Sequence, residues 1–447
     1  MAGHYDVVVV GAGSAGCVLA ARIARPGRRV LLLEAGPDDR GAPPPGIIGP
    51  SFHLALQEPG RQWPDLVALR TAAQAPRVYL RGRGLGGSSA VNAMLALRGV
   101  PDDYDEWGRQ FGAEGWSAAE AERWFAAVQL PQRPAPAAER GPLATALLAA
   151  GLGGQAALLT RDHTGRRVSA AAAYLPAARD AGLEVRGDAL VDRVLVDGPV
   201  AAGVRLADGE EIEAGTVVVC AGAIHSPAIL LRSGLDRSGV GHGLQDHPSF
   251  PIAVRYRRPP AAGDGLAVAA YLRGRWRAAD DLQILPVDVA DPADPGVGFV
   301  MAALMRVASR GTVRLRSDRP EDPPEVDFAM LTDEQDMQGM HAAVALAERF
   351  LASEPLASVA DVLPYDSSSD GIRAGVGDYV HASSTCRMGA AGDPGAVVDG
   401  DCRVIAYEGL LVCDASVLPR VPRANTHLPV MMVAERTAAR LSERLAW

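Results

Sequence analysis

The first residues in the chain suited to binding a charged group form the glycine-rich run Gly11–Gly16. Each glycine has a separate use: Gly11 allows a tight turn, Gly13 lets a pyrophosphate approach the backbone, and Gly16 lets a helix pack closely on a strand. The free N–H groups and the positive dipole end of the following helix then face the anion. The predicted phosphate cradle consists of Gly11, Ala12, Gly13, Ser14, Ala15 and Gly16.

Two apolar strands and a helix are expected around this turn. The four valines Val7–Val10 are typical of a strand buried on both faces, Cys17–Ala24 is compatible with a helix, and Arg29–Leu33 forms a second strand before Glu34. An acid placed about 20 residues beyond the glycines accepts hydrogen bonds from ribose hydroxyls and repels a 2′-phosphate. The pattern therefore predicts a dinucleotide other than NADP, with Glu34 and Ala35 as contacts. The alternative, a glycine turn that only packs a helix on a sheet, does not account for Glu34.

A second glycine-rich stretch, Tyr79–Asn92, has the same anion-binding character. Its four glycines expose many backbone N–H groups, and its arginines and serines add positive charge and hydrogen-bonding hydroxyls. One dinucleotide with a pyrophosphate and a large ring system could use both loops, whereas the alternative is a flexible glycine loop. The predicted contacts in and after this stretch are Arg83, Gly86, Gly87, Ser88, Ser89, Asn92, Ala93, Met94 and Leu95.

The composition limits the possible function classes. A chain of 447 residues with 48% hydrophobic and 22% charged residues is expected to form two or three domains of a globular enzyme. The net charge of −9 argues against a nucleic-acid partner. The five cysteines have no CxxC spacing, so buried thiols, a reducing compartment and no metal site are expected. No signal peptide or membrane span is apparent, which predicts a cytoplasmic, bacterial protein.

The two glycine-rich stretches together resemble those of the glucose–methanol–choline (GMC) oxidoreductase family. The likeness is strongest in residues 7–36, 79–98, 217–248 and 376–440. The resemblance implies an α/β fold with a Rossmann-like FAD-binding domain and a second α+β substrate domain built on an antiparallel sheet. It also implies that FAD fills both loops. Members of the family mostly oxidise alcohols.

On this resemblance the chain is divided into three parts. Residues 1–248 are expected to form the first part of the FAD-binding domain, with a helical and loop excursion at about 101–180. Residues 249–375 contain apolar runs that suggest an antiparallel substrate-binding sheet, followed by an amphipathic helix at Asp333–Leu351. Residues 376–447 return to the FAD-binding domain. The apolar runs expected as strands of the sheet are Phe250–Tyr256, Leu266–Leu272, Leu282–Val289, Phe299–Val307 and Gly311–Arg316.

The resemblance adds further cofactor contacts outside the two loops. In the family a residue matching Val191 contacts adenine through its backbone, and residues matching Asp414 and Ala415 hold the ribityl and diphosphate part. Val91 stands where some members carry a histidine bonded covalently to the flavin. Because valine cannot form that bond, the predicted FAD is non-covalent. The added contacts are Val191, Ala221, Gly222, Asp414, Ala415, His427 and Leu428.

Two histidines, His381 and His427, match the family's catalytic positions. The resemblance implies that His381 faces flavin N5 and that His427 faces it across the substrate. Alcohol oxidation needs a proton acceptor near neutral pH and a donor to the alkoxide, and two imidazoles can supply both. We expect His381 to be the base, although the roles could be exchanged. From the residues alone, a lone histidine near a helix is more often structural, and His225 and His247 are interpreted in that way. Ser384 stands where the family mostly has glycine and is expected to narrow the pocket.

These observations predict FAD-dependent oxidation of a small-molecule alcohol to a carbonyl by hydride transfer to flavin N5. The electron acceptor, whether oxygen, a quinone or another, is left open, as is the oligomeric state. Two alternatives remain: a GMC-type enzyme with another reaction (elimination, oxidative cyclisation or light-driven decarboxylation), and a flavin-binding protein without turnover.

Overall fold

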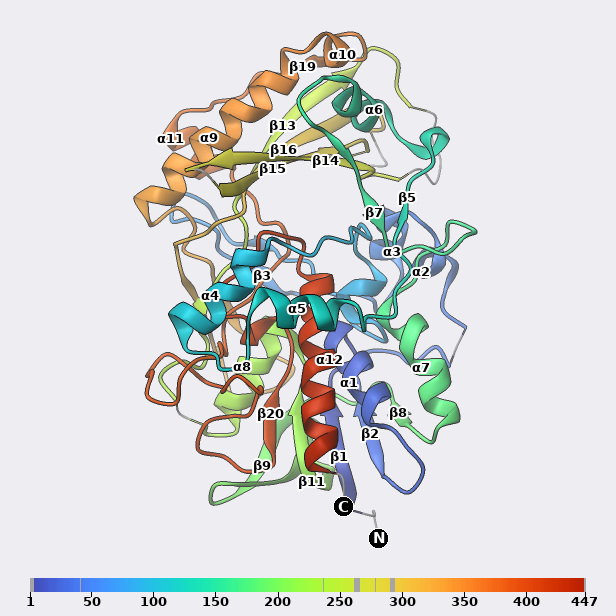
Figure 1. The fold of residues 1–447 in the computed structure, drawn as a ribbon, viewed down its shortest axis with the longest axis vertical. Helices are drawn as coiled ribbons and strands as arrows, with labels where there is room; N and C mark the ends of the chain where they lie inside the picture. Colours follow the sequence, from blue (N-terminus) through green and yellow to red (C-terminus); the bar gives the residue numbers. More distant parts are fainter. Residues whose placement is uncertain are drawn as a thin grey trace.

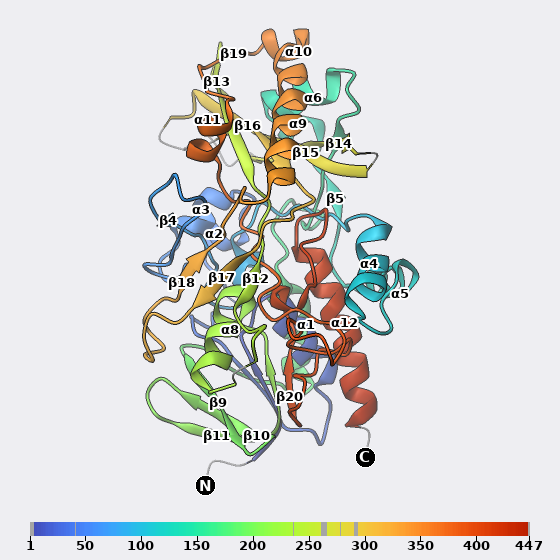
Figure 2. The same ribbon diagram turned by 90° about the vertical axis from the view of Figure 1, so that its left-hand side faces the viewer.

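The fold, obtained as a computed structural model, is described here for residues 4–40, 42–235, 237–260, 266–277, 279–289 and 294–445. Two sheet-based parts lie one above the other (Figure 1). The lower part contains both ends of the chain and a mainly parallel sheet. The upper part contains an antiparallel sheet, and Figure 2 shows the long helix α9 (Glu334–Leu351) lying along it. This arrangement is the predicted pairing of a Rossmann-like domain with a second, sheet-based domain.

The lower sheet is built around the valine strand. Its parallel strands run in the order β8 (Glu184–Arg186), β2 (Val30–Leu33), β1 (Tyr5–Val10), β11 (Glu211–Val219) and β20 (Leu410–Val412). Val7 to Val10 are at most 3% exposed, which confirms the prediction of a strand buried on both faces. The first half of β11 also pairs with an antiparallel meander of β10 (Val200–Leu206) and β9 (Val191–Asp197).

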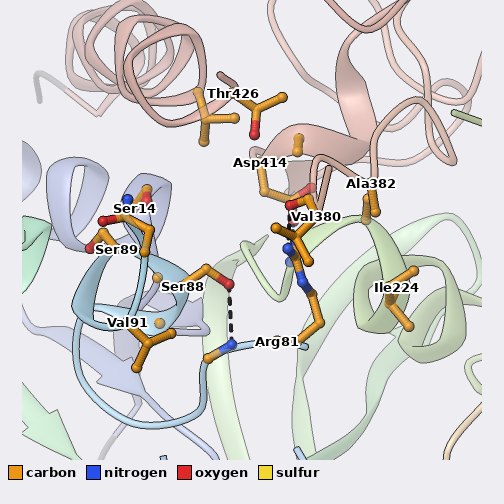
Figure 3. Close-up of a pocket in the computed structure, with 18 of the residues that line it drawn as sticks. Ser14, Arg81, Ser88, Ser89, Val91, Ile224, Val380, Ala382, Asp414 and Thr426 are labelled. Atoms are coloured by element: carbon orange, nitrogen blue, oxygen red, sulfur yellow. Dashed lines mark hydrogen bonds between the residues drawn. The ribbon is translucent and has the colours of Figure 1, made fainter. Parts of the chain in front are cut away.

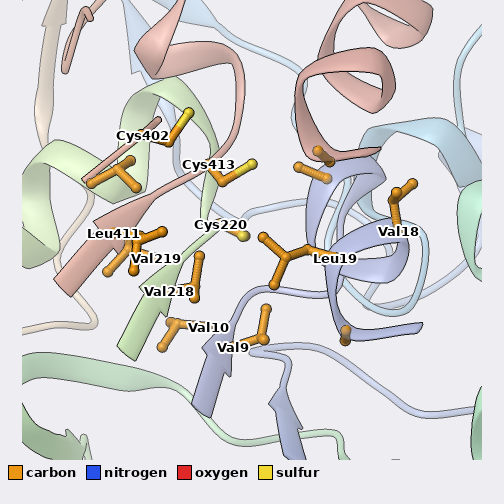
Figure 4. Close-up of a cluster of buried hydrophobic side chains, with 14 of the residues drawn as sticks. Val9, Val10, Val18, Leu19, Val218, Val219, Cys220, Cys402, Leu411 and Cys413 are labelled. Atoms are coloured by element: carbon orange, nitrogen blue, oxygen red, sulfur yellow. The ribbon is translucent and has the colours of Figure 1, made fainter. Parts of the chain in front are cut away.

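Helices cover this sheet and close its core. The helix α1 (Ser14–Ile23) lies beside the last helix, α12 (His427–Arg444), and beside α7 (Ala170–Asp180). The buried carboxylate of Glu435 joins all three helices, because it accepts hydrogen bonds from Arg22 and from the Tyr174 hydroxyl. Figure 4 shows the core beneath them, where side chains of β1, β11, β20 and α1 meet three buried cysteines. All five cysteines are buried and free, as predicted.

The upper sheet has six strands, and every pairing is antiparallel. The helix α9 (Glu334–Leu351) packs on it, with Asp333 as its N-cap, which confirms the predicted amphipathic helix. In order the strands are β19 (Ala360–Val362), β13 (Ser249–Tyr256), β16 (Val297–Leu304), β15 (Ala279–Val287), β14 (Ala270–Trp276) and β6 (Gln155–Ala156).

One predicted strand belongs to a different sheet. The segment beginning at Gly311 forms β17 (Gly311–Arg314), which pairs with β12 (His242–Leu244) and β18 (Glu325–Asp327) and not with the six-stranded sheet. A Cβ at Gly311 would lie 1.9 Å from the Asp327 carbonyl oxygen, so only glycine permits this close pairing. Apolar alternation predicted the strand but could not identify its partner.

The excursion at 101–180 contributes to the upper sheet through β6 and the helix α6 (Pro142–Ala149). Asp288, directly after β15, accepts hydrogen bonds from Leu143 N at 2.6 Å and Ala144 N at 3.2 Å, at the start of α6. A buried carboxylate at a helix N-terminus satisfies N–H groups that would otherwise have no partner. Burial nevertheless raises the pKa of Asp288 to about 6.

The remaining elements are short and connect these layers. None of the helices in the described part of the chain is long and apolar enough to cross a lipid bilayer. The elements are α2 (Pro45–Ile48), α3 (Phe52–Gln57), β3 (Val67–Ala68), β4 (Arg77–Val78), α4 (Pro101–Phe111), α5 (Ala118–Phe125), β5 (Arg133–Pro134), β7 (Leu158–Leu159), α8 (Gly222–Arg232), α10 (Glu354–Ala357) and α11 (Ser369–Gly375), with single 3-10 turns at Gly87–Ala90, Ala137–Glu139 and Ala415–Val417.

Candidate active site

A cavity of about 460 Å³ runs from the first glycine turn to the upper sheet. Its walls include Gly13 at the glycine turn and Leu285 and Met301 on strands of the upper sheet. Figure 3 shows Ser14, Ser88 and Ser89 of the two glycine loops on one side and Val380 on another. A cavity that joins two layers in this way is the usual place for a cofactor and its substrate.

The first glycine turn is packed tightly on one side and open on the other. A Cβ at Gly16 would lie 1.9 Å from the Gly11 carbonyl oxygen, so the helix could not approach the strand with any other residue. A Cβ at Gly13 would have no neighbour within 4 Å, because this glycine borders the cavity. A Cβ at Gly87 would lie 2.9 Å from Gly13 Cα, so the two glycine loops touch.

The Glu34 carboxylate joins the two glycine loops. It accepts hydrogen bonds from Ala12 N at 2.8 Å, Gly36 N at 3.0 Å and Gly84 N at 2.9 Å. Burial raises the pKa of Glu34, while these three N–H donors oppose that shift. Glu34 also lines the cavity, so one side chain both closes the loop junction and borders the site.

Most of the predicted contact residues border this cavity. Five do not: Ala12, Gly16, Arg83, Gly86 and Leu428 lie behind the wall. Gly86 N donates to Ala12 O at 2.8 Å, and Arg83 donates to the Ala35 carbonyl, so these residues position the loops. Those at the cavity are Gly11, Gly13, Ser14, Ala15, Glu34, Ala35, Gly87, Ser88, Ser89, Asn92, Ala93, Met94, Leu95, Val191, Ala221, Gly222, Asp414, Ala415 and His427, together with His381.

The backbone of His381 is held in place by a hydrogen bond to the buried carboxylate of Asp246. Asp246 is 1% exposed and accepts hydrogen bonds from His381 N at 2.9 Å, Tyr379 N at 3.2 Å and the Tyr79 hydroxyl at 2.8 Å. The intervening Val380 has a φ of +56°, which is unusual for a β-branched residue. The hydrogen bonds to Asp246 thus hold a strained loop in one conformation, and this fixes where the His381 ring points.

The His381 ring contacts two side chains. Its Nδ1 lies 2.9 Å from His247 Nδ1, and its Nε2 lies 3.2 Å from Asn425 Nδ2. Asn425 also lines the cavity. Burial, the neighbouring His247 and then the positive charge of Arg81 lower the pKa of His381 well below its ordinary value. The imidazole is therefore neutral at physiological pH and can accept a proton.

His427 does not hydrogen-bond to His381, although both line the same cavity. Its Nδ1 lies 2.9 Å from Ser14 Oγ on the first glycine turn. Burial and the charge of Arg167 lower the pKa of His427 to about 4. His427 is the first residue of α12, whereas Asn425 precedes the helix, so their side chains leave the backbone in different directions.

The structure adds a neighbour of His381 that was not predicted, because Asn425 is the side chain in hydrogen-bond contact with its Nε2. The placement of His427 across the substrate from His381 stays a prediction, and both histidines line the same cavity. The signal was present, because Asn425 opens the Asn-Thr-His run that ends at His427. His247, interpreted as structural, also contacts the site. Ser384 does not border the cavity; it is fully buried with a φ of +74°, a conformation that favours glycine.

Family models, curated relatives and solved structures all indicate the same protein family. Models of the GMC oxidoreductase family match residues 5–249 and 307–434. The chain belongs to the GMC oxidoreductase family. It is 32% identical to 5-(hydroxymethyl)furfural oxidase from Methylovorus sp. (97% of this chain, 98% of that protein) and 32% identical to human mitochondrial choline dehydrogenase (97% and 89%). Among solved structures it is similar to a pyridoxine 4-oxidase from Mesorbium loti, with a TM-score of 0.89 and 29% identity over 98% of this chain and 99% of that one.

The cofactor of this GMC oxidoreductase is FAD, and the cavity has the features that FAD needs. The backbone at Gly13 and Gly222 is open, since a Cβ at either position would meet nothing within 4 Å. The buried atoms His427 Nε2 and Asn425 Oδ1 have no hydrogen-bond partner within the protein. Unpaired buried polar atoms are costly, so a ligand that hydrogen-bonds to them is expected here.

Asp246, His247 and His381 are also close enough to share a metal ion, since one atom of each lies within 4.8 Å of the others. However, both ring nitrogens of His247 and both oxygens of Asp246 already have hydrogen-bond partners within the protein. Metal binding would break these contacts. The geometry favours a hydrogen-bonded cluster.

Two of the three glycines of the first turn, Gly13 and Gly16, offer a matched test. We predict that Gly13→Ala folds normally but binds FAD more weakly by about tenfold or more, because its Cβ enters the space the cofactor uses. Gly16→Ala should be strongly destabilised, because its Cβ overlaps the Gly11 carbonyl. Thermal unfolding and FAD titration of the apoprotein measure both effects, with Gly392→Ala, which meets no neighbour, as the control. Equal FAD affinity of the Gly13→Ala and Gly392→Ala proteins would show that the cofactor does not approach this turn.

Proposed function

We propose that the protein oxidises an alcohol to a carbonyl compound, with His381 as the base that removes the hydroxyl proton. The observation that carries this proposal is the pair formed by His381 Nε2 and Asn425 Nδ2, 3.2 Å apart at the cavity wall. Within the protein Asn425 Nδ2 donates to the single lone pair of His381 Nε2, and in this proposal the substrate hydroxyl takes the place of that contact. His381 Nε2 then accepts from the hydroxyl, and Asn425 Nδ2 donates to its oxygen. Two such groups side by side suit a hydroxyl that is becoming an alkoxide.

Each residue of the pair has a definite part in the reaction. His381 Nε2 accepts the proton as the O–H bond of the substrate breaks. Asn425 Nδ2 donates a hydrogen bond to the same oxygen, so the negative charge that develops there is stabilised in a site with little water. Bound FAD supplies the hydride acceptor for the carbon-bound hydrogen. In this proposal His427, which is hydrogen-bonded to Ser14 on the first glycine turn, lies on the side of the cavity that holds the cofactor.

We further propose that FAD is held without a covalent bond. Val91 lines the cavity, and its aliphatic side chain has no nucleophilic atom. The flavin should therefore stay in solution when the protein is denatured and precipitated.

The cavity suits an alcohol with a neutral, apolar or aromatic body. From the upper domain, Val268, Leu285, Val287 and Met301 line it, and Trp63 stacks on His225 at 3.9 Å. Within the described residues its three lining carboxylates are already engaged: Glu34 with backbone N–H groups, Asp378 with Arg70, and Asp414 with Gly222 N and Ser226. A quaternary ammonium group would find no carboxylate there that is free of hydrogen bonds or an ion pair.

A panel of alcohols under anaerobic conditions tests this function. A neutral primary benzylic or aliphatic alcohol should bleach the flavin, and choline should do so at least about tenfold more slowly, since burying its charge without a partner is costly. Reoxidation with oxygen or a quinone then identifies the electron acceptor. The absence of bleaching with every alcohol would exclude alcohol oxidation and favour a flavin-binding protein without turnover.

Variants of the pair test the assigned roles in the same assay. His381→Ala and Asn425→Ala should each retain FAD and slow flavin reduction by on the order of 10²-fold or more. The control is His341→Ala, because His341 hydrogen-bonds to Ser369 and is not among the residues that line the cavity in the described part of the chain. Unchanged reduction in His381→Ala would remove this residue from the mechanism.

The pH dependence of flavin reduction gives a separate prediction. Because the pKa of His381 is lowered, its imidazole stays unprotonated as the pH falls through the ordinary histidine value of about 6.5. Protonation of His381 should therefore leave the reduction rate level between pH 8 and about 6.5, and lower it only at more acidic pH. Stopped-flow reduction with flavin absorbance as a check on FAD content measures this profile. Asp246, which holds the His381 backbone and whose pKa burial raises to about 7, titrates in the same range, so the profile of Asp246→Asn is measured beside it. A half-maximal rate at or above pH 6.5 in both proteins would contradict the prediction.

A further inference from the structure

A second histidine, His247, stands directly behind the proposed base. It is fully buried, and its ring lies edge-on to the His381 ring, at 88° with centroids 5.1 Å apart. His247 Nδ1 lies 2.9 Å from His381 Nδ1, and His247 Nε2 lies 3.0 Å from the Pro422 carbonyl oxygen. Both ring nitrogens of His247 are thus occupied within the protein.

These contacts permit one arrangement of protons. A carbonyl oxygen only accepts hydrogen bonds, so the nitrogen beside Pro422, His247 Nε2, carries a proton. Burial lowers the pKa of His247 to about 3, so the ring is neutral and its Nδ1 has no proton. His381 Nδ1 must then be the donor between the two rings. Neutral His381 is left with a bare Nε2, and Asn425 Nδ2 is correctly placed to donate to it.

We propose that the Pro422 carbonyl, acting through His247, fixes the tautomer in which His381 presents an unprotonated Nε2 to the substrate. His247 is in this sense a positioning residue, because it acts through His381. The inference rests on the proposed role of His381 as base. It explains why a histidine stands behind the base: the ring can accept from one neighbour and donate to another across its width.

The fold holds the two rings in register. Segments 245–249 and 377–383 are bridged at one end by Gln245 and Ser383 and at the other by Ser249 and Gly377. His247 and His381 lie between these bridges.

The contacts between the Pro422 carbonyl, His247 and His381 also determine where the proton taken from the substrate can go. When His381 Nε2 takes the hydroxyl proton, Nδ1 keeps its own, because the buried His247 does not become cationic. The proton must therefore leave by the cavity side.

The experiment uses the FAD-loaded protein and a matched pair of variants. His247→Asn places an amide oxygen where Nδ1 was and can still accept from His381, whereas His247→Leu removes the acceptor. Proton–nitrogen correlation NMR of histidine-labelled protein reports which nitrogen of His381 carries the proton, and His381→Gln identifies the signals. Anaerobic flavin reduction by an alcohol substrate is measured in parallel.

The wild-type protein should show a protonated Nδ1 and a bare Nε2 at His381. His247→Asn should keep that pattern and reduce its flavin within about tenfold of wild type, while His247→Leu should move the proton to Nε2 and slow reduction on the order of 10²-fold or more. A wild-type spectrum with the proton on Nε2 would overturn the inference whether or not the variants fold. So would His247→Leu with an unchanged tautomer and rate. If the flavin of His381→Ala is reduced at the normal rate while wild-type His381 has the described tautomer, the proposed function fails, but the inference that His247 fixes this tautomer stands.

Discussion

The hydrogen bonds to the Asp246 carboxylate hold together segments that are far apart in the chain. Its two oxygens accept hydrogen bonds from the Tyr79 hydroxyl and from the backbone N–H of its neighbour His247. They also accept from the backbone N–H groups of Tyr379 and His381, more than 130 positions further along the chain. Burial raises the pKa of Asp246 to about 7, and the four donors stabilise the ionised form. The strained backbone at Val380 is held between two of these contacts. Without them, the loop that aims His381 into the cavity would lose the interactions that oppose its strain.

The same physical rule organises the other end of the cavity. Glu34 is also a buried carboxylate that accepts only backbone N–H groups, and those groups belong to the two glycine loops and the turn between them. Glycine is needed there because the loops approach within distances that exclude a Cβ. Glu34 borders the cavity at the glycine loops, whereas Asp246 lies outside the lining and fixes the backbone of His381, which borders it. Apolar side chains from the upper sheet also line the cavity.

Much of the fold follows from local sequence patterns. Four consecutive valines predicted a strand buried on both faces, and the glycine spacing predicted the turn that follows. The spacing of apolar residues in Asp333–Leu351 predicted a helix where the structure has one. Pairing partners were harder to predict, because β17 has the alternation of an upper-sheet strand but pairs elsewhere through the close approach at Gly311. Alternation reports which face of a strand is buried, and it does not report its neighbour.

The candidate site was predictable in location but not in detail. The sequence identified both glycine loops, His381 and His427 as cavity residues, but it did not identify Asn425 as the side chain that contacts His381. Which side chains of a three-residue run reach a given neighbour depends on where α12 begins. His247 looked like an ordinary turn histidine because its contact with His381 spans 134 positions of the chain. Residue types indicate which chemistry is available, whereas tautomers and hydrogen-bond partners depend on the folded geometry.

A crystal structure of the FAD complex with an alcohol-like inhibitor is the most direct measurement of the central claim, that His381 and Asn425 together face the reacting hydroxyl. We expect the flavin ring between the second glycine loop and this pair, with the inhibitor oxygen within hydrogen-bond distance of both His381 Nε2 and Asn425 Nδ2. An inhibitor oxygen bound by His427 with Asn425 turned away, or a flavin ring outside the cavity, would contradict it.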